Sequence, residues 1–137
     1  MNDQKRNRIE QALQLSEDLR KAINLLDGFE ESYVRKNLDI CIASCESICS
    51  ILKKIISDEV SSHENVPINL HSADNTYNMR YAVRRLNDAL TDYTSLLTGL
   101  KSFIDKCGET YWSERADATI DFEVTAEFNE KSLKRAL

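Results

Sequence analysis

Proline and glycine are scarce in this chain of 137 residues, which contains one proline and three glycines. Both residues interrupt helices, so their scarcity leaves long segments that can stay helical without a break. The chain also lacks any apolar run close to the roughly 20 residues that span a bilayer as a helix. With 42% hydrophobic and 30% charged residues, the composition is that of a soluble globular protein. We predict a single helical domain over residues 1–137.

Patterns that carry catalysis, metal binding or nucleic-acid binding are also missing. The sequence has no CxxC pair, no phosphate-binding loop and only two histidines. Its net charge of -5 argues against nucleic acid as the main ligand, because that affinity depends on Lys and Arg. The polar segment 1–9 is not followed by an apolar stretch, which predicts a cytoplasmic protein with no membrane partner. We therefore expect a protein that is not an enzyme and uses no cofactor.

The clearest pattern that is present is a heptad repeat between residues 79 and 107. Its apolar members recur at alternating steps of three and four: Met79, Ala82, Leu86, Ala89, Tyr93, Leu96, Leu100, Phe103 and Cys107. A second row lies beside them, at Val83, Leu90, Leu97 and Ile104. Three apolar positions in seven are typical of a helix in a bundle, whereas a two-stranded coiled coil needs only two.

Similar patterns predict two earlier helices, so that helices span about 3–27, 30–57 and 75–107. Gly28 and Gly108 follow the first and third helices as stop signals. The predicted fold is mainly all-α: an up-down-up bundle of three long helices. A loop at 58–73 contains the only proline, Pro67, and alternating apolar residues there are compatible with a short edge strand.

The C-terminal segment, 109–137, changes character. From Ile120 to Phe128 apolar and polar residues alternate, which favours a short strand, and a short terminal helix follows. A helical interpretation stays open, because Ile120, Val124 and Phe128 also stand four residues apart. The segment is predicted to be irregular or partly extended. A strand there needs a neighbour, and a second protomer or a partner protein would supply one.

Cysteines and histidines offer two alternative functions. Cys41, Cys45 and Cys49 line one side of the second helix, where they serve either as core residues or as part of a metal- or redox-responsive site. His63 and His71 lie in the predicted loop near carboxylates and are the only site worth testing for an enzyme. We favour core packing for the cysteines and solvated loop positions for the histidines, and we assign no metal site.

The leading hypothesis is a non-enzymatic protein-binding module, such as a small inhibitor, an immunity protein, an antitoxin-like regulator, a chaperone or an adaptor. Its partner is another protein of unknown identity, and a homodimer is compatible with the long third helix. Aromatic residues and arginine dominate binding hot spots, and alternating apolar residues suit an interface. The predicted partner-binding residues are Tyr111, Trp112, Ile120, Phe122, Val124, Phe128, Arg80 and Arg84.

Overall fold

A computed structural model of the chain describes residues 3–106 and 112–136. These residues form four α-helices and one short 3-10 turn, and they contain no β-strand. The elements are α1 (Asp3–Ile23), α2 (Glu31–Glu64), η1 (Ile68–Leu70), α3 (Ala73–Lys106) and α4 (Trp112–Arg135). The prediction of a mainly helical bundle is confirmed, with a fourth helix in addition to the three expected.

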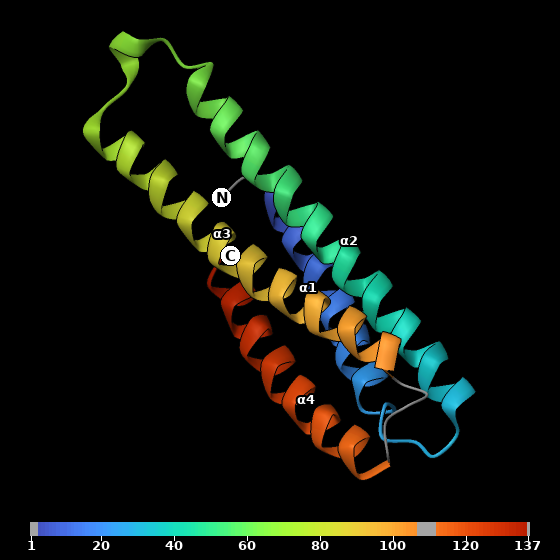
Figure 1. Cartoon of the computed structure of the whole chain (residues 1–137). Helices are drawn as coiled ribbons and strands as arrows, with labels where there is room; N and C mark the ends of the chain where they lie inside the picture. The colour runs from blue at the N-terminus through green and yellow to red at the C-terminus, as the bar shows by residue number, and fades with distance from the viewer. Residues whose placement is uncertain (1–2, 107–111, 137) are drawn as a thin grey trace.

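Each helix runs antiparallel to the one before it (Figure 1). Arg8 near the start of α1 pairs with Asp58 near the end of α2. At the end of α4, the carbonyl oxygen of Arg135 accepts a hydrogen bond from Arg85 Nη1 of α3 over 2.8 Å. Because α1 and α3 each pack on both α2 and α4, the four helices form one bundle.

The helices differ in length, and this difference shapes the molecule. Both α2 and α3 contain 34 residues, whereas α1 contains 21 and α4 contains 24. The α2–α3 hairpin therefore projects beyond the part where all four helices pack (Figure 1). We call that four-helix part the body, and residues 60–84 the tip.

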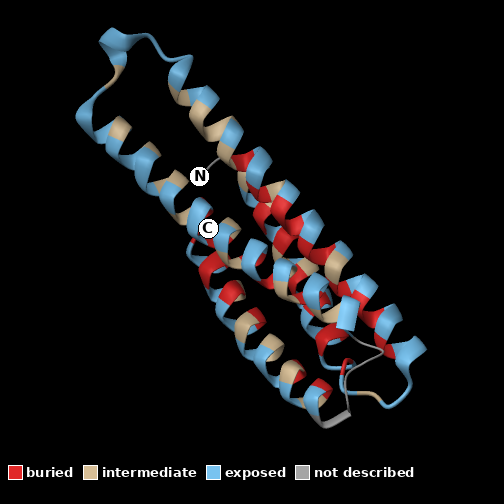
Figure 2. Ribbon diagram, viewed as in Figure 1, coloured by how far each residue is buried: buried red, intermediate tan, exposed pale blue. Residues whose placement is uncertain are grey.

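The core lies in the body, where Figure 2 shows the buried residues concentrated between the helices. Its α3 contribution is the heptad stripe, and the members that are fully or almost fully buried are Leu86, Ala89, Tyr93, Leu96 and Leu100. The Tyr93 hydroxyl lies 2.7 Å from Ser16 Oγ of α1, and both side chains are inaccessible to solvent. This hydrogen bond satisfies two polar groups that would otherwise destabilise the core.

The predicted strand at 120–128 is wrong, because the segment lies within α4, which also absorbs the predicted terminal helix. The physical reason is that α4 also carries a helical pattern of alternating three- and four-residue steps, which shares only some of its positions with the strand-like alternation. The six residues that follow this pattern on the inner side of α4 are Arg115, Thr119, Phe122, Ala126, Asn129 and Leu133. Half of them are polar, so a search for apolar periodicity alone did not reveal this helical face.

The predicted loop at 58–73 is also too long. Helix α2 continues through Glu64, past the predicted end at residue 57. Asp58 and Glu59 form ion pairs with Arg8 and Lys5 of α1, and these contacts favour the helix although the segment lacks apolar periodicity. After Pro67 the chain forms η1 instead of the strand considered for this segment.

Candidate interaction surfaces

The tip exposes apolar side chains that the core does not use. Ile68 is 86% exposed and Leu70 is 61% exposed, and both lie in η1 at the end of the hairpin. Residues 64–70 are all exposed, because neither α1 nor α4 extends to cover them. Large apolar residues grouped in this way are typical of surfaces that bind other proteins.

Beside this apolar end, the first turns of α3 carry aromatic and basic residues on one face. Tyr77 is followed at steps of three, four and seven residues by Arg80, Tyr81 and Arg84, which places all four on one helix face, and all are exposed. The rings of Tyr77 and Tyr81 are nearly parallel, with centroids 6.2 Å apart. We call these four residues the Tyr-Arg face.

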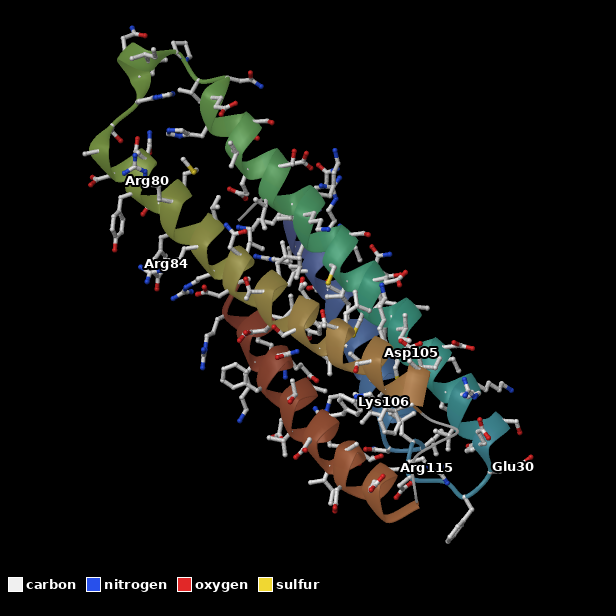
Figure 3. The ribbon with its side chains drawn as sticks, in the orientation of Figure 1. Glu30, Arg80, Arg84, Asp105, Lys106 and Arg115 are labelled. Atoms are coloured by element: carbon white, nitrogen blue, oxygen red, sulfur yellow. The ribbon has the colours of Figure 1, made fainter. Side chains whose placement is uncertain are left out.

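The two arginines of the Tyr-Arg face differ from the neighbouring Arg85. The Arg85 guanidinium lies 4.3 Å from the centroid of the Tyr81 ring and also donates to Arg135. By contrast, within residues 3–106 and 112–136 neither Arg80 nor Arg84 forms an ion pair or hydrogen bond. Figure 3 shows both on the projecting part of α3, at the opposite end of the molecule from Arg115. Both guanidinium groups therefore keep their donors available to a partner.

The predicted histidine pair lies within the tip, where His63 near the end of α2 meets His71 just after η1. His63 and His71 stack with ring centroids 4.3 Å apart, and His71 Nε2 lies 3.0 Å from the carbonyl oxygen of His63. A cavity of about 350 Å³ beside them is lined by Glu59, Asn78 and Met79, among others. Within the described ranges no group of three His, Cys, Asp or Glu side chains is arranged to hold a metal ion. The histidine contacts tie the connection to the end of α2.

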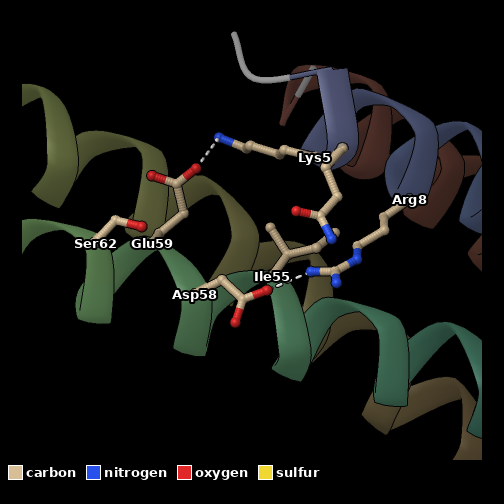
Figure 4. Close-up of a pocket in the computed structure, with 7 residues that line it drawn as sticks. Lys5, Arg8, Ile55, Asp58, Glu59 and Ser62 are labelled. Carbon is tan, nitrogen blue, oxygen red and sulfur yellow. Dashed lines mark hydrogen bonds and ion pairs between the residues drawn. The ribbon is translucent and has the colours of Figure 1, made fainter.

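A second cavity, of about 420 Å³, lies between the start of α1 and the end of α2 (Figure 4). Its charged groups are already paired, since Lys5 Nζ lies 3.2 Å from Glu59 Oε1 and Arg8 bonds Asp58. The hydrogen bond from Arg8 holds the pKa of the Asp58 carboxyl below its ordinary value. This cavity therefore joins two helices and offers no uncompensated charge to a ligand.

Cys41, Cys45 and Cys49 are buried as free thiols in the core. Burial raises the pKa of Cys41 from 9.0 to about 12, and it also raises the pKa of Cys45 and of Cys49. Thiols with raised pKa values stay protonated at neutral pH, and thiolate is the form that reacts and binds metals. The burial of these three residues thus supports the core-packing interpretation over the metal or redox alternative.

The outer face of α4 is the second exposed apolar surface. Ile120, Val124 and Phe128 lie one turn apart and are 57%, 64% and 54% exposed. Three of the predicted partner-binding residues are thereby brought onto one face. We call them the α4 stripe.

The remaining predicted residues lie elsewhere. Phe122 turns inward, where its ring meets Phe103 edge-on with centroids 5.6 Å apart. Tyr111 lies outside the described residues, and Trp112 begins α4 without a described side chain. Arg80 and Arg84 belong to the tip, so the eight predicted residues do not form one site.

The inner side of α4 shows polar contacts that the sequence reasoning missed. Asn129 Nδ2 donates to the carbonyl oxygen of Asp92 over 3.0 Å, and Ser132 Oγ donates to Asp92 Oδ2 over 2.7 Å. At the other end of the helix, Arg115 donates from Nη2 to the carbonyl oxygens of Gly28 and Phe29 over 3.4 and 3.2 Å. Helix α4 therefore has a partly polar inner side and an apolar stripe outside.

Comparison of the chain with known protein families, curated proteins and solved structures gives no match. Among the described helices, none is both long and apolar enough to cross a membrane. Any account of function therefore depends on the two exposed surfaces themselves.

Proposed function

We propose that this chain is a non-enzymatic protein-binding module, and that the tip binds an acidic segment of a partner protein. The observation that carries the proposal is the pair of exposed arginines, Arg80 and Arg84, that share one helix face with two exposed tyrosines. Tyrosine and arginine are the residue types enriched where interface energy concentrates. Arginine also binds carboxylates and phosphates through two parallel hydrogen bonds.

The surroundings of the Tyr-Arg face support an acidic protein segment as the ligand. The chain as a whole has a net charge of -5, so a local group of arginines attracts an acidic partner against an otherwise unfavourable field. The apolar side chains of Ile68 and Leu70 lie on the same tip and offer contacts to apolar residues of that segment. Two free arginines are too few to hold nucleic acid against this net charge.

The proposal is tested by affinity capture from the source organism with the wild-type chain and with an Arg80→Glu, Arg84→Glu variant. Proteins that bind the tip should be retained by the wild type and lost from this variant. The matched control is Arg6→Glu, Lys53→Glu, because both residues are exposed and this pair changes the net charge by the same amount. The control should retain the same proteins as the wild type.

A photoreactive amino acid in place of Tyr77 then identifies the bound segment. The crosslinked peptide should be rich in Asp and Glu or carry phosphate groups, and capture should weaken as salt screens the charges. An Arg80→Lys, Arg84→Lys variant should bind only partly, because lysine keeps the charge but not the planar fork. Capture that is equal in the glutamate variant and the wild type, or that nuclease treatment abolishes, would refute the proposal.

A further inference from the structure

The α4 stripe is a surface that the tip hypothesis does not use. Its three residues are more than half exposed, although the inner side of the same helix buries polar Thr119, Asn129 and Ser132 almost completely. Placing large apolar groups in solvent is unfavourable by about 25 cal/mol for each Å² of apolar surface. A helix with this distribution gains stability when a second surface covers its outer side.

Charged residues extend the stripe at both ends, with opposite signs. Glu114 and Asp117 precede it, and Lys131 and Arg135 follow it, on the same exposed face. Within the described part of the chain, neither acidic side chain has an ion-pair partner. Lys131 approaches only Glu127, at 4.0 Å, and both of these side chains are more than half exposed.

The spacing of these charges is symmetric about Val124. Asp117 and Lys131 are each seven residues, or one heptad, from Val124. Glu114 and Arg135 lie about three turns away on either side. When two copies of this helix lie antiparallel with Val124 at the crossing point, Asp117 faces Lys131 of the second copy. Glu114 likewise faces Arg135 of the second copy, and Ile120 and Phe128 flank the centre.

We infer that the α4 stripe binds the α4 stripe of a second copy of this chain, antiparallel and around a two-fold axis at Val124. Such a contact is isologous, because the same patch serves both protomers. A parallel arrangement would instead place Asp117 against Asp117 and Lys131 against Lys131, which like-charge repulsion disfavours. Acidic residues at the start of a helix and basic residues at its end also suit the helix dipole, but the dipole does not account for the apolar stripe.

The inference is independent of the proposed binding function of the tip. The tip projects beyond the end of α4 at Arg135, so a dimer built on α4 leaves both tips uncovered (Figure 1). Because the two α4 helices would be antiparallel, the tips of the two protomers would point in opposite directions. The dimer would then present two separate sites for an acidic partner.

Sedimentation equilibrium over a concentration series tests whether the dimer forms. The wild type should approach twice the 15.7 kDa mass of the chain, and Val124→Glu should remain at 15.7 kDa with an unchanged helical circular dichroism spectrum. The matched control is Ile40→Glu, since Ile40 is an exposed apolar residue on α2 and is 43% exposed. This control should dimerise like the wild type, and a wild-type chain that stays monomeric at every concentration would overturn the inference.

Charge reversal then tests the antiparallel arrangement. Asp117→Lys alone and Lys131→Glu alone should each weaken self-association roughly tenfold or more, because each places like charges face to face. A mixture of these two single variants should form a heterodimer, since every facing pair is then of opposite sign. Failure of the mixture to associate would overturn the antiparallel pairing, and so would undiminished self-association of the single variants.

The same samples keep this inference separate from the function proposed for the tip. Arg80→Glu, Arg84→Glu should dimerise normally, and Val124→Glu should still capture the proteins that bind the tip. A dimer that the tip variant abolishes would contradict the assignment to α4.

Discussion

The body and the tip are built from the same two long helices, yet they bury their side chains to different extents. In the body, Leu86 and Leu100 of the α3 stripe are completely buried, whereas in the tip Met79 and Ala82 of the same stripe are only half-buried. The heptad pattern is continuous across both regions. What differs is the number of neighbouring helices, because in the body α4 packs against α3 and α1 packs against α2, whereas neither α1 nor α4 extends along the whole tip (Figure 2).

This comparison indicates a division of roles within one hairpin. The body supplies the stability of the fold through its apolar core and the hydrogen bond between Ser16 and Tyr93. The tip contributes little buried surface, so its side chains can be selected for binding without a large loss of stability. Exposed arginines and tyrosines at Arg80, Arg84 and Tyr77 are consistent with that freedom.

The largest difference in stability between the two regions is expected when one apolar residue of each is truncated to alanine. Leu52 is completely buried in the body, so Leu52→Ala should lower the free energy of unfolding by about 2–5 kcal/mol through lost burial and a cavity. Ile68 at the tip is 86% exposed, so Ile68→Ala should change the free energy of unfolding by less than about 0.5 kcal/mol. Urea denaturation followed by circular dichroism measures both. Equal losses would show that the tip contributes to the cooperative core.

A smaller loss of stability is expected at alkaline pH, through the buried Cys41 thiol of the body. The Cys41 thiol has a pKa of 9.0 in its ordinary state and about 12 when buried, so the folded chain keeps a proton that the unfolded chain loses. The contribution of this thiol to stability is therefore constant below pH 9 and falls as the pH rises toward 12, by on the order of 1–3 kcal/mol. Cys41→Ala should make this decline shallower in denaturation curves recorded across that pH range. An equally steep decline in the variant would show that Cys41 does not couple folding to pH.

The sequence predicted the body well and α4 poorly, for a physical reason. In α2 and α3 the inward positions hold large apolar residues such as Ile48 and Leu96, so the period of the burial pattern is visible in hydrophobicity. In α4 the inward positions include Arg115 and Asn129, whose side chains donate hydrogen bonds to backbone oxygens of other segments. Hydrogen bonds to distant backbone groups are a tertiary property, and hydrophobic periodicity does not detect them.

The candidate surfaces show the same limit. The sequence indicates apolar and basic binding residues at Ile120, Val124, Phe128, Arg80 and Arg84, but it does not show that they lie on two separate surfaces. Only the arrangement of the helices separates the α4 stripe from the Tyr-Arg face and places them on different parts of the molecule. The strand prediction also misplaced Phe122, which packs against Phe103 in the core region.

Hydrogen exchange of individual amides in the free chain tests the division between body and tip most directly. We predict that amides at 41–52 and 86–100 exchange only when the whole chain unfolds, because the core encloses those helix segments. Amides at 60–84 should exchange through local openings of clearly lower free energy. Equal protection of the two regions would contradict the account, because the tip would then be part of the cooperative core.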